Sequence, residues 1–301
     1  MSTDQQLPSL LLTKDLQDDA LWRQARSHTL ERIRRGAYTP TAPDQPPLER
    51  AIVLARLHIE AVSRQTRQAH WFSHQSAAFL HGLPTLVVPE VTHVIQHYRR
   101  SGGADPRVRR HYVPLKVHDQ DVVDGLPVTS LERTVLDCAR GTNLTEAVMI
   151  IDAYLHNGGD PDRLNRRVQE LRGQRGVRLA AKHIEWSDAG AESPGESRTR
   201  VLLRRGGLYP HTQVVVHTHL GRFRVDMGWP EYRVGVEYDG LAKYTRLAEG
   251  DPAKVVFEEK RRQDALEDAG WSIQRVTHAD LRNPDRLLAA VRHRLHRARP
   301  R

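Results

Sequence analysis

The sequence has a single cysteine, Cys138, among its 301 residues. One cysteine excludes an internal disulfide framework and a zinc site built from several cysteines, and we expect Cys138 to be a small buried residue. The chain also lacks any run near the roughly 18 apolar residues of a membrane span, so no membrane association is expected. Residues 1–12 have no basic segment and no small-residue cleavage site, which predicts a cytoplasmic protein without a secretory signal.

Nucleophilic and zinc sites also lack support in the sequence. No serine stands in a nucleophile elbow, and Cys138 has no Cys/His context, so covalent catalysis is not expected. The histidines include two close pairs, His93 with His97 and His217 with His219. Both pairs lie in strand-like segments and have no evident third ligand, so we do not expect zinc at either pair.

Positive charge is what the chain has in excess. It carries 46 Lys and Arg against 37 Asp and Glu, a formal charge of +9. Arginines gather near the start, in the middle and at the end of the chain, and the first group is Arg32, Arg34 and Arg35. This charge favours a nucleic-acid partner, with DNA expected, over an acidic small molecule. A solvated surface without a partner is the alternative for each cluster.

Proline, glycine and polar stretches divide the chain into three parts. The segments 41–47 and 187–195 have the composition of linkers, so the predicted parts are 1–47, 48–186 and 193–301. The fold class expected is a multidomain α/β (α+β) protein with a small α/β middle region. That region has helical patterns over 48–68 and 73–80 and strand-like patterns over 91–98 and 108–113.

The N-terminal part has the pattern of a winged helix-turn-helix. It predicts a short helix from a Thr13 N-cap, a helix over 21–33, and a basic extended segment over 32–40 that could lie against phosphates as a β-wing. We assign DNA contacts to Arg32, Arg34 and Arg35. The alternative is an N-terminal packing subdomain without a DNA-binding role.

The C-terminal part predicts an α-β-β-β-α-β-α order. Ser193, Pro194 and Glu196 form a helix start of the capping-box type. Strands are expected over 213–219, 222–227, 233–239 and 272–276, with a helix over 253–269 and a last helix from Asn283. The first three strands suggest an antiparallel meander.

Acidic residues on two of these strands form the candidate catalytic site. Alternation places Glu237 and Asp239 on one face of their strand, and hairpin pairing would bring Asp226 beside Glu237. Carboxylates that close repel one another unless a hard cation such as Mg²⁺ or Mn²⁺ lies between them. Glu196 is either a third metal ligand or only the capping-box partner of Ser193.

The helix that follows supplies candidate cations. Lys260 and Arg261 could position the attacking water or stabilise the transition state, and Arg262 would suit contact with a DNA phosphate. Asp264 stands four residues after Lys260, so an ion pair along the helix is its expected role.

The C-terminal part resembles a PD-(D/E)XK nuclease of the very-short-patch-repair (Vsr-like) type over residues 193–301. The resemblance implies a restriction-endonuclease-like core, with Asp226 and Glu237 as metal ligands and Glu196 as an additional helix acid. Asp239 stands where the superfamily pattern has lysine, which leaves a degenerate site open. The matching residues are Ser193-Pro194-Gly195-Glu196-Ser197-Arg198, Gly207-Leu208, Gln213, Arg224-Val225-Asp226, Trp229-Pro230-Glu231, Val236-Glu237-Tyr238-Asp239-Gly240, Lys260-Arg261-Arg262-Gln263-Asp264, Gly270-Trp271 and Arg275-Val276-Thr277.

The rest of the chain resembles an AbiEi-like antitoxin module, in an architecture of actinobacterial proteins where it precedes a nuclease-like domain. The resemblance implies operator DNA binding and a possible cognate toxin. The residues that carry it are Arg34-Arg35-Gly36-Ala37-Tyr38, Ser73-His74-Gln75-Ser76-Ala77-Ala78, Gly82-Leu83-Pro84, Gly125-Leu126-Pro127-Val128-Thr129-Ser130 and Arg133-Thr134-Val135-Leu136-Asp137.

Two functions follow from these patterns. The first is a DNA-binding, Mg²⁺-dependent endonuclease. The second is a non-catalytic regulator or antitoxin of a type IV toxin–antitoxin system, with a degenerate nuclease domain. The two functions can also be combined, with the N-terminal part directing the nuclease to a target sequence.

Overall fold

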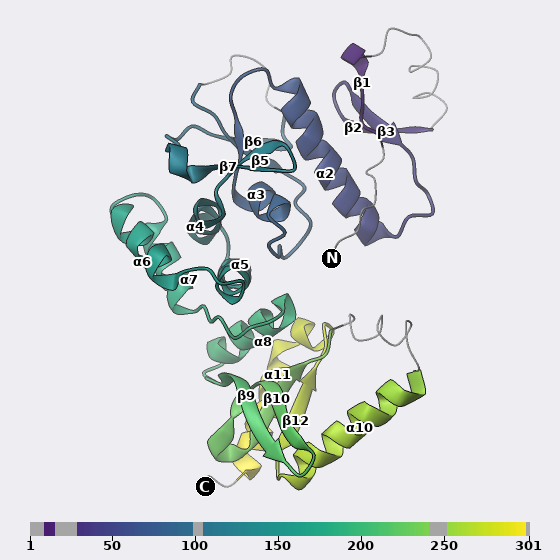
Figure 1. Ribbon diagram of the computed structural model, residues 1–301, viewed down its shortest axis with the longest axis vertical. Helices are drawn as coiled ribbons and strands as arrows, with labels where there is room; N and C mark the ends of the chain where they lie inside the picture. The colour runs from purple at the N-terminus through teal and green to yellow at the C-terminus, as the bar shows by residue number, and fades with distance from the viewer. Residues whose placement is uncertain (1–8, 16–28, 99–104, 241–251, 299–301) are drawn as a thin grey trace. The chain divides into compact units, whose positions relative to one another are not determined.

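The computed structural model describes residues 9–15, 29–98, 105–240 and 252–298, with only the backbone for 252–255 (Figure 1). The fold is a mixed α and β, multidomain one, as the sequence predicts. It divides into two compact units, Met1–Gly141 and Thr142–Arg301. In the described ranges, no helix combines the length and the apolar character needed to cross a membrane.

The first unit begins with a small three-stranded sheet in the order β1-β3-β2. Its elements are β1 (Leu11–Leu12), the 3-10 turn η1 (Thr13–Asp15), β2 (Leu30–Arg34) and β3 (Ala37–Pro40). The helix predicted over 21–33 is wrong at its end, because residues 30–33 pair with β3 as a strand and bury Ile33 in the core. The remainder of that prediction lies outside the described residues. The basic extended segment is present as the β2–β3 hairpin.

Helix α2 (Pro47–Gln65) joins the small sheet to the rest of the first unit. Leu57 and Ala61 pack against the small sheet. Ile59 and Val62 pack into the core of the larger sheet. The predicted boundary between 47 and 48 therefore falls at the start of a helix that both sheets share.

The larger sheet of the first unit has five strands in the order β6-β5-β4-β8-β7. The strands are β4 (Trp71–Phe72), β5 (Thr92–Ile95), β6 (Val108–His111), β7 (Gln120–Val123) and β8 (Leu126–Thr129). The turn η2 (Val117–Asp119) precedes β7, and the helices α3 (His74–Leu80) and α4 (Leu131–Gly141) pack on each other. Cys138 is buried in α4, as expected from the sequence.

The second unit starts with three helices that precede residue 193. They are α5 (Leu144–His156), α6 (Pro161–Glu170) and α7 (Val177–Glu185). Helix α5 packs on α8 (Pro194–Arg205), and the fully buried Asp152 on α5 pairs with Arg200 on α8 at 2.6 Å. The predicted linker is also held in place, because Asp188 donates its backbone N–H to Asp152 at 2.8 Å and accepts from Thr212 at 2.9 Å.

A four-stranded sheet forms the centre of the second unit, in the order β12-β11-β10-β9 (Figure 1). The strands are β9 (His211–Thr218), β10 (Gly221–Trp229), β11 (Val234–Tyr238) and β12 (Ser272–Val276), joined by the turns η3 (Pro230–Tyr232) and η4 (Asp280–Arg282). β9, β10 and β11 form the predicted antiparallel meander, and β12 adds in parallel. Helices α8 and α11 (Pro284–Arg297) pack on one face, and α10 (Pro252–Asp268) on the other.

Candidate functional site

The predicted acidic residues lie at the open end of the β10–β11 ladder. The last paired residues at this end are Met227 and Val236, so the next position in the same register places Asp226 opposite Glu237. The ladder stops there, because the Asp226 carboxylate accepts the backbone N–H of Tyr238 at 2.7 Å. The register therefore places the two residues opposite each other at the end of the hairpin, with the Asp226 carboxylate bonded to the backbone of β11 and that of Glu237 bonded to Arg262.

The strict alternation expected for β10 fails at Asp226. Val225 packs on the α10 face of the sheet with Leu266. Met227, two residues further on, packs on the opposite face with Leu203. A regular strand would place both side chains on one face. The irregularity frees Asp226 from the normal pairing and lets its side chain bond the neighbouring backbone.

Glu237 is held by an arginine on α10. Its side chain is only 5% exposed. Arg262 donates to both carboxylate oxygens, with Nη1 at 3.2 Å from Oε2, and Nη2 also donates to the main-chain oxygen of Arg224 at 3.0 Å. Burial alone would lower the pKa of Arg262, but Glu237, with Glu259 and Asp226, raises that pKa above its usual value. The Glu237 charge is therefore compensated by a guanidinium.

Glu196, the acid at the start of α8, is bonded to β9 through Gln213. Glu196 donates its backbone N–H to Ser193 Oγ at 3.2 Å, so the predicted capping interaction at the start of α8 is present. The Glu196 side chain makes two further hydrogen bonds. Its Oε2 accepts from the backbone N–H of Glu192 at 3.0 Å and from Gln213 Nε2 at 3.2 Å. Gln213 stands on β9 between Thr212 and Val214, which pair with Met227 and Val225 on either side of Asp226.

Gly195 explains how α8 comes this close to β11. A Cβ at Gly195 would lie 1.9 Å from Cε1 of Tyr238, so any larger residue would clash with the ring. The Tyr238 ring faces the α8 side, while its backbone N–H faces Asp226. The motif glycine therefore permits the contact that sets Glu196 near the strand ends.

The cations are arranged differently from the prediction. Lys260 is 62% exposed and pairs with Asp264 at 2.8 Å, which confirms the helix ion pair expected for Asp264. Arg261 is exposed and lies 5.9 Å from the centroid of the Phe257 ring. Arg262, assigned from the sequence to DNA phosphates, is the residue that reaches the acids. Its ion pair with Glu237 joins residues 25 apart, a contact that sequence spacing does not reveal.

A surface pocket of 460 Å³ opens beside this ion pair. Arg262 forms one wall and also lies 5.8 Å from the centroid of the Phe223 ring. The pocket combines an aromatic face, two arginines and two glutamates. Its lining residues are Leu220, Phe223, Glu258, Glu259, Arg261 and Arg262.

Asp239 continues β11 by one hydrogen bond. Its backbone N–H donates to Val276 on β12 at 2.7 Å, and the residue is half-buried. Asp239 thus follows Glu237 by two residues along an extended chain, as expected from the motif.

Two proteins of Mycobacterium tuberculosis, the uncharacterized proteins MT2308 and Rv2248, are each 32% identical to this chain over 205 residues. The aligned stretch covers 65% of this chain and 73% of each relative. The chain belongs to their family. No protein-family model matches the sequence. A solved structure, that of RV2827C protein from M. tuberculosis, is similar at a TM-score of 0.40 and 16% identity, covering 64% of this chain and 75% of that one.

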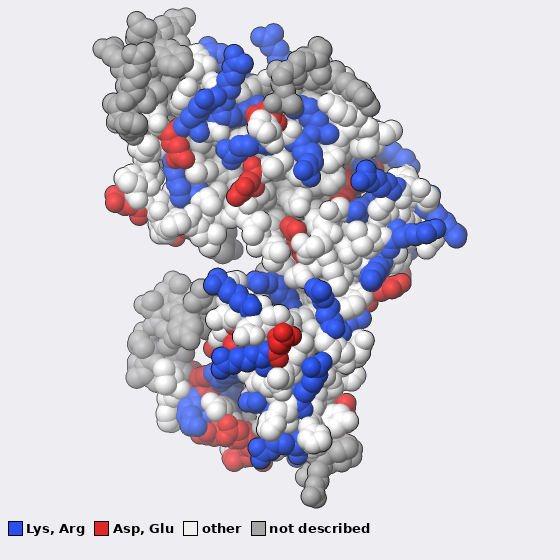
Figure 2. All heavy atoms as spheres, turned by 180° about the vertical axis from the view of Figure 1, so that it is seen from behind, with Lys and Arg blue, Asp and Glu red and all other residues white. Residues whose placement is uncertain are grey.

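In this member of the MT2308 family, the three arginines of the β2–β3 hairpin differ in how far they are exposed to solvent. Arg32 and Arg35 are exposed. Arg34 is only 11% exposed and pairs with Asp105 at 2.8 Å. The hairpin thus offers two arginines to a partner, while the third ties it to the five-stranded part of the same unit. On the face shown in Figure 2, basic side chains are spread over both units with acidic ones among them.

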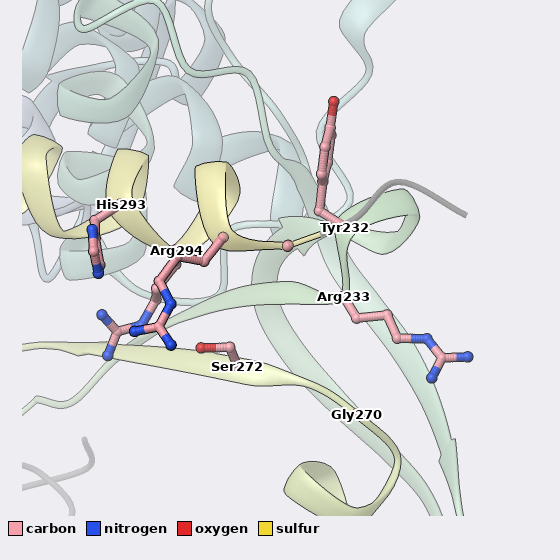
Figure 3. Close-up of a pocket in the computed structure, with 8 residues that line it drawn as sticks. Tyr232, Arg233, Gly270, Ser272, His293 and Arg294 are labelled. Carbon is pink, nitrogen blue, oxygen red and sulfur yellow. The ribbon is translucent and has the colours of Figure 1, made fainter.

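A second basic pocket of this family member, of 610 Å³, lies at the far end of the same sheet. Its residues come from the starts of β11 and β12 and from the end of α11, whereas Glu237 lies near the end of β11. Figure 3 shows Arg294 extending toward Ser272, while Arg233 points away and donates to Ala269 O at 3.0 Å. This pocket is therefore separate from the acidic site.

Proposed function

We propose that the second unit hydrolyses phosphodiester bonds of DNA with a divalent cation, Mg²⁺ or Mn²⁺. The observation that carries this proposal is the placement of Asp226 opposite Glu237 at the end of the β10–β11 ladder, with Glu196 bonded to Gln213 on the neighbouring strand β9. Carboxylates at strand ends can hold the metal that assists phosphodiester hydrolysis, and Arg262 on α10 supplies a cation beside them.

The side chains fit a hard cation. Asp226 and Glu237 supply carboxylate oxygens, the ligands that Mg²⁺ prefers, and one or two carboxylates suffice when water and phosphate complete the shell. Arg262 holds both oxygens of Glu237, so a cation that uses Glu237 requires Arg262 to release at least one of them. When bound, Mg²⁺ would lower the pKa of the attacking water and neutralise charge on the departing oxygen.

The chain's own residues have separate tasks in this proposal. Asp226 is fixed in position by the N–H of Tyr238. Asp239 is a candidate to orient the attacking water or to add a ligand. Arg262, anchored also to Arg224 O, keeps a positive charge beside the site and stabilises the negative charge that develops on the phosphate. Lys260, which pairs with Asp264, and Arg261 lie on the exposed side of α10, so we give the charge-stabilising role to Arg262.

DNA binding would involve the first unit as well. Arg32 and Arg35 on the β2–β3 hairpin are exposed and suit contact with phosphates, in the manner of a β-wing. In this proposal the AbiEi-like part brings the acidic site to its DNA, as the combined role drawn from the sequence requires.

A second candidate function is that of a non-catalytic DNA-binding regulator of the antitoxin type, with or without a cognate toxin. Two observations favour it. The Glu237 carboxylate is already compensated by Arg262, and Asp239 stands where the nuclease pattern has lysine. On this alternative the ion pair is structural and the second unit only contacts nucleic acid.

Nicking of supercoiled plasmid and of branched DNA in Mg²⁺ separates the two candidates. We expect Asp226→Asn to reduce the nicking rate about 100-fold or more, because a metal ligand is lost. Asp264→Asn is the matched control, since Asp264 is an exposed acid of the same unit that pairs only along its helix in the contacts described. Equal rates for wild type and Asp226→Asn would exclude this site. A wild-type protein that binds promoter DNA but does not nick it in Mg²⁺ or Mn²⁺ would favour the regulator.

A further inference from the structure

Three histidines of the first unit come together although they are far apart in the sequence. They are His74, His93 and His111, and one ring nitrogen from each lies within 4.8 Å of the others. The sequence pairs His93 with His97 and offers that pair no third ligand, whereas the fold gives His93 two other histidine neighbours. Its partners are 19 and 18 residues away, and the nearer His97 is exposed beyond the end of β5.

The five-stranded sheet places two of the three rings. β5 and β6 are parallel, with His93 opposite Arg109 and Ile95 opposite His111. His93 and His111 are thus two positions apart on the same face of neighbouring strands, which brings their rings together. His93 Nδ1 lies 3.1 Å from His111 Nε2.

Helix α3 supplies the third ring and is fixed to β5 on both sides of His74. Ser73 donates its backbone N–H to His93 O at 3.0 Å, and His93 donates its own N–H to Ser76 Oγ at 2.8 Å. His74 has φ of 51°, a left-handed conformation that is uncommon for a residue with a side chain. Such a conformation persists where surrounding contacts hold it and is frequent at functional sites.

The nitrogen positions suit a tetrahedral metal. Zn–N bonds of about 2.0–2.1 Å give neighbouring ligand nitrogens a separation of about 3.3 Å, close to the His93–His111 distance. His74 Nδ1 lies 3.0 Å from Ser73 Oγ, so a bond to that hydroxyl leaves Nε2 available as a ligand. The His74 ring now stacks on His111 with centroids 4.0 Å apart, so metal binding requires His74 to rotate.

We propose that His74, His93 and His111 bind a transition-metal dication of the Zn²⁺ type, with water completing the coordination. Three imidazoles select Zn²⁺, Co²⁺, Ni²⁺ or Cu²⁺ over Mg²⁺, which prefers oxygen ligands. Three protein ligands with a water is also the arrangement of exchangeable or catalytic zinc rather than of closed structural sites. The site is separate from the acids of the second unit and takes a different class of metal.

Two electrostatic effects bear on metal binding by the cluster, the protonation of the rings and the charge of nearby arginines. Burial, with the charge of neighbouring groups, lowers the pKa of His74 to about 2 and those of His93 and His111 to about 4. Imidazole binds metal in its neutral state, so a metal competes with protons for these rings. Arg109, Arg133 and Arg140 oppose a dication, but Arg133 is compensated by Asp119 and Asp137 at 3.1 and 3.0 Å.

Metal titration of the full-length protein tests the proposal. After treatment with a chelator, Zn²⁺ is titrated by calorimetry and Co²⁺ by its visible absorption, whose intensity reports four-coordinate geometry. We expect one equivalent to bind with that signature, and His111→Gln to weaken binding at least about 100-fold, since even outer partners of metal ligands cost 10–100-fold. His97→Gln is the matched control, because His97 is exposed and outside the cluster.

A second variant keeps the test decisive if His111→Gln does not fold. His74→Asn retains a residue that tolerates the left-handed backbone, and we expect the same loss of binding. Wild type should also melt at a higher temperature with Zn²⁺. A wild-type protein without a Zn²⁺-dependent rise and without bound Co²⁺ would overturn the proposal, as would binding by His111→Gln or His74→Asn equal to that of His97→Gln. Asp226→Asn should bind Zn²⁺ normally whether or not the second unit is a nuclease.

Discussion

At the scale of single residues, the main feature of the acidic site is the ion pair between Arg262 and Glu237. The Arg262 guanidinium compensates the buried Glu237, whereas Lys260 and Arg261, the cations that the sequence favours for catalysis, are exposed. The sequence predicts that Asp226 and Glu237 meet, because hairpin pairing is a local property. It does not predict Arg262 as their partner, because the rotation of α10 about its axis is set by packing of Leu266 against the sheet.

Removal of Arg262 should therefore leave a buried uncompensated carboxylate. We expect Arg262→Met to lower the free energy of unfolding by about 3–5 kcal/mol, as found when one partner of a buried ion pair is lost. Arg261→Met, on the exposed side of the same helix, should change it by less than about 0.5 kcal/mol. Thermal melts measure both. If Glu237 is also a metal ligand, Mg²⁺ should raise the melting temperature of Arg262→Met more than that of wild type. Equal Mg²⁺ shifts would argue against metal binding by Glu237.

His58 gives the first unit a predictable sensitivity to acid. It is buried on α2 with Nδ1 2.6 Å from Thr92 Oγ1, and burial, together with Arg107 and Arg34, lowers its pKa from 6.5 to about 4. Between these values the unfolded chain takes up a proton that the folded chain does not. The contribution of His58 to the free energy of unfolding is therefore fully present above pH 6.5. It falls by about 3 kcal/mol as the pH is lowered toward 4. Denaturant unfolding at several pH values should show a flatter profile for His58→Gln, and an unchanged slope relative to His97→Gln would contradict this cause.

At the scale of elements, local patterns succeed where a segment's own sequence determines its structure. Ser193 and Asn283 cap α8 and α11 as predicted, because a side chain bonds the backbone three residues on. The prediction fails at 30–33, where pairing with β3 overrides a helical pattern. It fails again at Asp226, where the strand irregularity depends on the bond to Tyr238 on another strand.

We expect the arginines of the β2–β3 hairpin to contact DNA phosphates. Arg32→Ala with Arg35→Ala should weaken DNA binding about equally for all sequences and reduce the slope of log affinity against log salt by up to about 2, because two phosphate contacts are lost. Filter binding or fluorescence anisotropy at several salt concentrations measures this. Removal of two exposed arginines from the other unit, Arg261 and Arg292, is the control, and an equal loss in both variants would show only a dependence on net charge.

At the scale of the whole molecule, the chain divides into two compact units. The sequence predicts the order of helices and strands from α8 to α11 but not the helices α4 to α7. It places breaks at 47 and near 187–195, whereas the units divide between Gly141 and Thr142. Linker-like composition is a local signal. The buried Asp152–Arg200 pair, which joins residues 48 apart, binds α5 to α8 and has no such signal.

Asp152→Ala should therefore destabilise the second unit. The pair has side-chain exposures of 2% and 0%, so loss of Asp152 leaves Arg200 buried without its partner, at a cost of about 3–5 kcal/mol. Glu170→Ala breaks the more exposed pair with Arg167 in the same unit and should cost less than about 1 kcal/mol. Calorimetry should show that only one of two unfolding transitions shifts in Asp152→Ala. A shift of both transitions by the same amount would contradict independent stability of the units.

The position of a bound cation tests the central claim most directly. Crystals grown with Mn²⁺ and measured at a wavelength where Mn²⁺ scatters anomalously would locate the ion. We predict an anomalous peak between the carboxylates of Asp226 and Glu237, with Arg262 released from at least one Glu237 oxygen, and loss of that peak in Asp226→Asn. Crystals with Mn²⁺ elsewhere or not at all, and with Arg262 still on both oxygens of Glu237, would contradict a catalytic metal at this site.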